Sequence, residues 1–190
     1  MRRTSAWLIG MAVATLPLPA MAGGLPPFLT PQHAIEPPRG FVSMCEAQPD
    51  MCVSPAATHL AVSDTAIDLL REVNYRVNRH VRQVSDQTRF ARSDVWQPSG
   101  IDRGARGDCE DLALEKRKLL IEAGFPADRL FLALAYGQQG VGLHLVLVAR
   151  TDREDVVLDS RSHTIQPWSA APYTWIAMQR PEQPMAWFSV

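Results

Sequence analysis

One cysteine in this chain stands where a nucleophile would be placed. Cys109 lies in GARGDCEDLALEK, two residues after Gly107 and at the start of a stretch with helical periodicity. A helix N-terminus stabilises a thiolate through its free backbone N–H groups and the helix dipole, and the thiolate is the nucleophilic form of cysteine. Cys109 is therefore a candidate nucleophile, although cysteines at helix starts are also common as plain buried residues.

The partners that such a thiol needs are a histidine and a carboxylate. His144 lies in GLHLVLVAR and Asp159 in VVLDS, with TDRE between these apolar segments. If the segments pair as a hairpin, a two-residue loop places position 144 opposite 159, and a four-residue loop places it diagonal to 159. Both registers put the two side chains on one face of the sheet, and a three-residue loop would not.

A carboxylate beside a histidine orients the ring, and the other ring nitrogen can accept a proton from a thiol. The combination of Cys109, His144 and Asp159, called the catalytic trio below, therefore predicts nucleophilic catalysis. The alternative interpretation is a satisfied core histidine at 144 and a turn-proximal cap at 159.

The N-terminus predicts export. Arg2 and Arg3 precede an apolar run from Ala6 to about Pro17, and Ala20-Met21-Ala22 forms a small-residue cleavage site. This pattern is typical of a secretory signal peptide. The run is shorter than the ~20 apolar residues that a membrane anchor needs. We expect residues 1–22 to be removed near Ala22, leaving a periplasmic or secreted protein that does not span the membrane.

The cysteine count fits an oxidising compartment. The chain contains three cysteines, and an odd number leaves one thiol unpaired within the chain. Cys45 and Cys52 enclose only EAQPDM, so a local disulfide between them is the economical pairing and Cys109 is the free thiol. Zinc is less attractive because the spacing is not C-x2-C. The formal net charge of −1 offers no basic footprint for a nucleic acid.

The catalytic trio must be positioned by an α+β domain. We expect an irregular proline-rich arm over residues 23–60 and one domain over residues 61–190. A helix is predicted from Asp64, and a second helix from Cys109 to about Ala123, where Gly124 and Pro126 end it. The apolar face of the first is formed by Ile67, Leu70, Val73, Val77, Val81 and Val84. The segments RLFLALAYG, LHLVLVAR and DVVLDS predict an antiparallel sheet, with one more strand in the tail.

These motifs resemble a known family. The run DVWQPSGIDRGARGDCEDLALEKRKLLIEAGFP, followed by LHLVLVAR and VVLDS, is similar to the bacterial transglutaminase-like cysteine proteinases, a group that includes periplasmic adhesin proteases. The resemblance covers about residues 64–188. It implies a papain-like fold in which the cysteine helix packs on an antiparallel sheet that carries the histidine and the aspartate. It also implies Cys109 as nucleophile, His144 as general base and Asp159 as orienting acid.

The resemblance carries further expectations around the nucleophile. It implies a calcium ion held by Asp108 and Glu110, and no organic cofactor. The Cys109 backbone N–H is the natural first donor to an oxyanion, with the Trp96 N–H or the Gln97 amide as a second. The chain departs from the adhesin proteases at WQPSG, where they have W-x-x-P-x-E, and its cysteine-bearing arm looks closer to shorter relatives.

The functional hypothesis is an exported thiol peptidase that forms an acyl-enzyme and processes a cell-envelope or surface protein. An inner-membrane regulatory receptor is a further partner that the resemblance implies. One alternative is a transglutaminase-type acyltransferase, in which an amine resolves the same intermediate. Another is a non-catalytic periplasmic binding module on the same fold.

Overall fold

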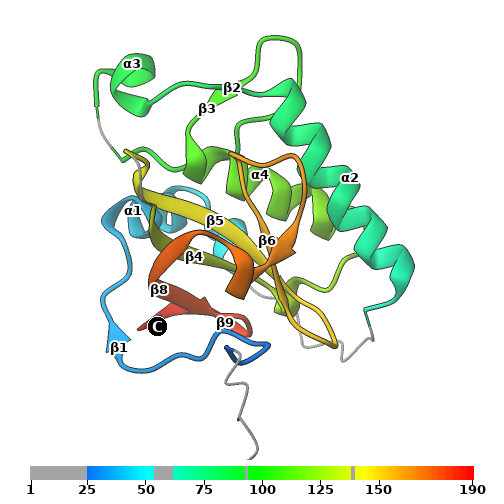
Figure 1. Ribbon diagram of the computed structural model, residues 1–190. Coiled ribbons are helices and arrows are strands. Elements are labelled where there is room, and N and C mark those ends of the chain that lie inside the picture. The colour runs from blue at the N-terminus through cyan, green and yellow to red at the C-terminus, as the bar shows by residue number, and fades with distance from the viewer. Residues whose placement is uncertain (1–24, 54–61, 93, 138–139) are drawn as a thin grey trace, which may run out of the picture.

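The computed structural model describes residues 25–53, 62–92, 94–137 and 140–190, so the predicted signal peptide lies outside the described residues. A seven-stranded antiparallel sheet has the order β1-β9-β8-β4-β5-β6-β7. Two long helices, α2 and α4, lie on the same side of it (Figure 1). The predicted α+β class with a nucleophile helix on an antiparallel sheet is confirmed. The strands are β1 (Ala34–Ile35), β4 (Leu130–Gly137), β5 (Gly142–Arg150), β6 (Asp155–Leu158), β7 (Gln166–Pro167), β8 (Tyr173–Arg180) and β9 (Gln183–Ser189).

Helix α2 (Asp64–His80) begins where the sequence predicted, with the Ser63 Oγ accepting from the Ala66 N–H at 3.3 Å. It ends earlier than the apolar spacing suggested, because the chain leaves the helix to form β2 (Arg82–Gln83). This strand pairs in parallel with β3 (Arg106–Gly107). The Val84 N–H donates to the Gly107 carbonyl at 2.9 Å, so Val84 belongs to this strand pair and not to the helix face.

Helix α4 (Cys109–Glu122) matches its predicted span within one residue. It packs between α2 and β5, as Figure 1 shows. Because it contacts an element on either side, α4 is buried on a broad surface that includes Leu112, Leu114 and Leu120. The nucleophile candidate is thus the first residue of the most enclosed helix in the described part of the chain.

The β5–β6 hairpin has the four-residue loop, one of the two predicted registers. Arg150 pairs with Asp155, and Leu147 pairs with Leu158. Asp159 follows directly after the last residue of β6. The loop is closed by the Thr151 N–H, which donates to the Glu154 carbonyl at 3.0 Å.

Two segments are more ordered than the sequence suggested. The tail forms two strands, β8 and β9, and not one. The arm, expected to be irregular, contains α1 (Arg39–Ala47), which buries Phe41 and Met44 in the main core. The predicted disulfide between Cys45 and Cys52 is confirmed, with Cα atoms 5.6 Å apart.

Short helices complete the described chain, at α3 (Asp86–Phe90), η1 (Pro49–Cys52), η2 (Ala127–Arg129) and η3 (Trp168–Ala170). Within the described ranges, the helices are all too short or too polar to cross a membrane.

Candidate active site

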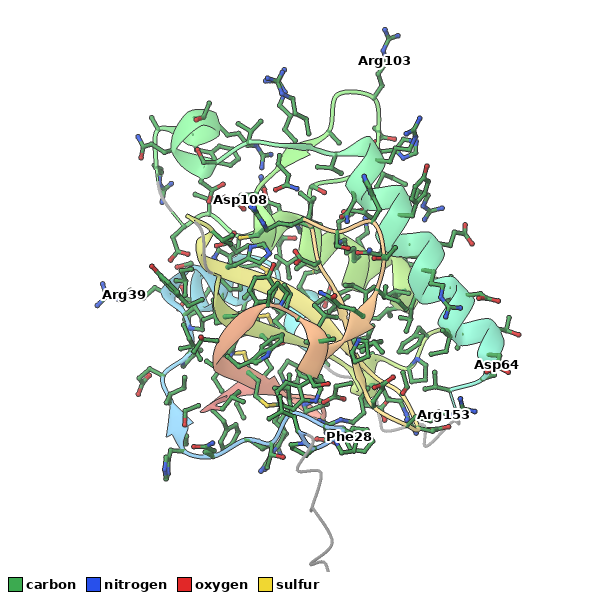
Figure 2. The ribbon with its side chains drawn as sticks, in the orientation of Figure 1. Phe28, Arg39, Asp64, Arg103, Asp108 and Arg153 are labelled. Carbon is green, nitrogen blue, oxygen red and sulfur yellow. A yellow bond between two sulfur atoms is a disulfide. The ribbon has the colours of Figure 1, made fainter. Side chains whose placement is uncertain are left out.

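The site forms where the N-terminus of α4 meets β5 and the end of β6. Cys109 is the first residue of α4 and Asp108 is its N-cap; Figure 2 labels Asp108 at this end of the helix. The close approach of β3 to the first turn of α4 requires a glycine at 107. A Cβ atom there would lie 2.5 Å from the Asp111 Cβ, which is closer than carbon atoms pack. Gly107 therefore lets β3 run close against the first turn of the helix.

His144 and Asp159 form a buried pair. The His144 Nε2 lies 2.7 Å from the Asp159 Oδ1, and both residues are at least nine-tenths buried. The same carboxylate accepts from the Tyr173 hydroxyl at 2.5 Å and from the Arg161 N–H at 2.9 Å. Burial alone would raise the Asp159 pKa, but these hydrogen bonds outweigh it and hold the pKa below its ordinary value. Asp159 is therefore an ionised carboxylate that fixes the imidazole through Nε2 and leaves Nδ1 as the free ring nitrogen.

The Cys109 thiol is directed at a different group. It is a free, partly buried cysteine, and it donates to the Glu110 Oε2 at 2.9 Å. Burial raises the pKa of the Cys109 thiol far above its ordinary value, and the Glu110 charge adds to this. Among the described residues, Asp159 is the one hydrogen-bonding partner of the His144 side chain. The thiol of Cys109 is thus directed at Glu110, and the His144 ring at Asp159.

A group of three acids, two buried and one half-buried, lies beside the thiol. Asp86, Asp108 and Asp111, called the acid cluster below, each offer a carboxylate oxygen within 4.8 Å of the others. Burial, with a neighbouring carboxylate adding to it, raises the pKa of Asp108 to about 6 and that of Asp111 to about 7. Glu110, predicted to share a metal with Asp108, is outside this cluster and is bonded to the thiol instead.

The acid cluster has both satisfied and unsatisfied oxygens. Asp111 pairs with Arg89 and accepts from the Gln97 N–H at 3.1 Å. Asp86 accepts from the Val95 N–H at 2.5 Å. However, one buried oxygen of Asp86 and one of Asp108 have no hydrogen-bond partner. Buried carboxylate oxygens without partners are costly, and carboxylates are the oxygen ligands that calcium takes. These residues therefore fit a calcium ion.

The prediction that the Trp96 ring donates to an oxyanion needs correction. Its indole N–H donates to the Asp94 Oδ1 at 2.7 Å, and its ring packs edge-on against Phe41 at 5.9 Å between centroids. The side chain is buried, and its donor is already used. The Gln97 backbone N–H is used by Asp111, which leaves the Gln97 side-chain amide as the second candidate donor.

The comparisons with known proteins decide the family. The model of the bacterial transglutaminase-like cysteine proteinases, the Peptidase_C93 family, matches residues 32–190. The chain belongs to this family. It is accordingly a cysteine peptidase with a transglutaminase-like fold.

Among solved structures, the chain is similar to calcium-bound LapG of Legionella pneumophila, with 23% identity, a TM-score of 0.50 and 73% of each chain covered. EGTA-treated LapG of the same organism has 23% identity and a TM-score of 0.49, with 73% of this chain and 71% of that chain covered. No curated protein matches the chain at a significant level.

Proposed function

We propose that this peptidase is exported and that Cys109, His144 and Asp159 catalyse its reaction through an acyl-enzyme. The observation that carries the proposal is the buried His144–Asp159 pair beside the N-terminus of the cysteine helix. Family membership supports a peptide substrate. The signal-like segment before residue 23 supports export to the periplasm or beyond, where a cell-envelope or surface protein would be the substrate.

The reaction follows from the positions of these groups. The Cys109 thiol turns from Glu110 toward His144 and passes its proton to Nδ1, while Asp159 supports the imidazolium through Nε2. The thiolate attacks the scissile carbonyl, and the Cys109 backbone N–H at the helix start donates to the developing oxyanion, with the Gln97 amide as second donor. The imidazolium then protonates the leaving amine. Water activated by His144 hydrolyses the thioester and restores the thiol.

We propose further that the acid cluster binds calcium. The two partnerless buried oxygens support this assignment, as does the calcium-bound state named for LapG. A divalent cation there would supply positive charge that offsets the carboxylates around the thiol. Asp108 keeps the role expected from the sequence. Glu110 is the second acid of that expectation, and its bond to Cys109 makes it a partner of the thiol.

Calcium binding is tested without any activity assay. Terbium luminescence and calorimetric titration of calcium are measured on the Cys109→Ala protein and on the same protein carrying Asp86→Asn. Loss of binding in the second variant is the expected result. Asp68→Asn, at an exposed acid on α2, is the matched control and should leave binding unchanged. Equal affinity in all three proteins would overturn the assignment.

The peptidase role is tested by comparing cell-envelope proteins of cells that carry the wild-type protein or Cys109→Ala, using terminal-labelling proteomics. New N-termini that need Cys109 are expected, and they should also disappear in His144→Ala. His163→Ala is the control, because His163 is an exposed histidine that packs on Tyr75. Identical terminal profiles for wild type and Cys109→Ala would favour a non-catalytic binding module.

The acyltransferase alternative shares the nucleophile and base, so it needs a different measurement. Mass spectrometry of the products with and without a lysine-like amine donor distinguishes a free carboxyl terminus from a new amide. An inner-membrane receptor stays a proposed partner, to be sought by crosslinking the Cys109→Ala protein in cells.

A further inference from the structure

A lysine is completely buried beneath the proposed catalytic groups. Lys116 is 0% exposed, and it lies seven residues after Cys109 on α4. Positions seven apart on a helix fall on the same face. Lys116 and the thiol therefore lie on one side of α4, two turns apart.

The hydrogen bonding of Lys116 is too weak to offset the free-energy cost of burying its charge. Within the described chain its one hydrogen bond goes from Nζ to the Leu158 carbonyl, at 3.5 Å. This is long for a bond from an ammonium, which ordinarily has three donors to satisfy. An isolated ammonium in an apolar interior is strongly unfavourable. A nearby negative charge would offset part of this cost.

That charge is Asp159, the residue that directly follows Leu158. Burial lowers the pKa of Lys116 to about 7, and the Asp159 charge opposes this by favouring the ammonium. At pH 6 the side chain is thus mainly charged. The other groups that face Asp159 are His144 from β5, Tyr173 from β8 and the Arg161 N–H from its own loop.

Helix α2 hydrogen-bonds to the same loop through two amides, and its Tyr75 packs against His163 with ring centroids 5.6 Å apart. The Asn78 Nδ2 donates to the carbonyls of Asp159 and Ser162, both at 2.7 Å, and the Asn74 Nδ2 donates to Ser162 at 2.9 Å. These bonds hold the backbone of the loop but bring no charge to the carboxylate. Asp159 is the charge that favours the ammonium form of Lys116.

We propose that Lys116 is a positioning residue for the catalytic trio: its ammonium, bonded to the last carbonyl of β6, adds to the hydrogen bonds that hold Asp159 as an anion in the place from which it orients His144. The inference rests on the proposed function only in giving Asp159 and His144 catalytic roles. The coupling between Lys116 and Asp159 can be measured whether or not the protein cleaves a peptide.

The test follows the Asp159 side-chain carboxyl carbon by NMR as the pH is varied. The signal is assigned by its loss in Asp159→Asn. Replacing Lys116 by Met should raise the Asp159 pKa enough to change its ionisation constant about tenfold or more, the factor that corresponds to one pKa unit. Reciprocally, Asp159→Asn should shift the titration of the Lys116 side chain toward lower pH by a similar factor.

Arg117→Met is the matched control. Arg117 is the next residue on α4, is also buried, and donates to the Met51 carbonyl on the arm. Its loss should leave the Asp159 titration within about twofold of wild type, because the two side chains face different elements. Lys116→Gln is the second variant and should behave like Lys116→Met.

Two results would overturn the proposal. One is an Asp159 titration in both Lys116 variants that superimposes on wild type. The other is failure of both Lys116 variants to fold, since that would assign the lysine to stability alone. If the NMR coupling is present while envelope proteolysis is unaffected by Cys109→Ala, the coupling stands and the proposed envelope proteolysis is lost.

Discussion

In the absence of calcium, the protein should become less stable as the pH rises from about 4 to about 7. The acid cluster is the cause. An acid whose pKa is raised by folding binds more protons in the folded state than in the unfolded state, so stability falls as pH rises through this window. The pKa of Asp111 rises from 3.8 to about 7, and its side chain is fully buried.

The size of the effect follows from these values. For Asp111 alone, linkage gives about 4 kcal/mol, since each pKa unit corresponds to about 1.4 kcal/mol. Asp108 is partly exposed and shares protons with its neighbours, so its contribution is discounted. Even half of the Asp111 value, about 2 kcal/mol, would lower the melting temperature by roughly 4–8 °C for a domain of this size.

The assay is calorimetric unfolding of the Cys109→Ala protein at pH 5 and pH 7.5, with EDTA or with calcium. The melting temperature in EDTA should be lower at pH 7.5, and calcium should restore it there. At pH 5 calcium should have less effect, because protons already neutralise the carboxylates. Asp111→Asn should flatten the pH dependence, whereas the exposed-site control Asp68→Asn should not. A melting temperature in EDTA that is equal or higher at pH 7.5 would refute the reasoning.

Three further predictions concern the thiol, the orienting acid and the arm. Glu110→Gln removes a charge that raises the pKa of Cys109. Alkylation of Cys109 by iodoacetamide in EDTA at pH 7 should therefore be about tenfold faster or more. An unchanged rate would contradict the thiol–Glu110 bond. Asp159→Asn should lower kcat/KM by ~10³ to 10⁴, the loss seen when a triad acid no longer sets the histidine tautomer. Asp152→Asn, in the β5–β6 loop, is the control. Comparable losses of kcat/KM in both variants would contradict a specific role for Asp159. Replacing Cys45 and Cys52 by alanine opens a loop with a sequence separation of 7 and should cost about 2–3 kcal/mol in urea unfolding; no change in the midpoint would mean that α1 holds the arm unaided.

The positions of the proposed nucleophile, base and orienting acid were predictable because each depends on short-range signals. The apolar spacing after Cys109 and the Gly124 stop define α4. Alternation along β5 and the length of the following loop place His144 and Asp159 on one face. A sequence pattern predicts an element well when the pattern lies within the residues that form that element.

The acid cluster was not predictable in the same way. Asp86 comes from α3, and it approaches Asp108 only because β2 and β3 pair and draw two distant segments together. Tyr173, the hydroxyl partner of Asp159, comes from β8, in a tail for which the sequence predicts only one strand. Trp96 was predicted as a donor because the sequence does not reveal that Asp94 accepts from its ring.

Lys116 did leave a signal. It interrupts the apolar face of α4 between Leu112 and Leu120, and a charged residue at such a position implies either a break in the face or a buried partner. The end of α2 differs from its prediction for another reason. Val84 continues the apolar spacing of the helix, but its N–H donates to the backbone of β3 and not to a further helical turn.

The edge strand β1 has a consequence for the order in which the chain can fold. Ala34 pairs with Phe188 and Ile35 with Trp187, so a strand synthesised early has its partner among the last residues described. Contacts this far apart in sequence are slow to form, because a long loop must be closed first. This edge of the sheet stays open until β9 has been synthesised, and the β8–β9 ribbon must form before β1 can cover it. In a peptidase built this way the β1–β9 pairing is therefore a late step of folding, which follows the formation of β8 and β9.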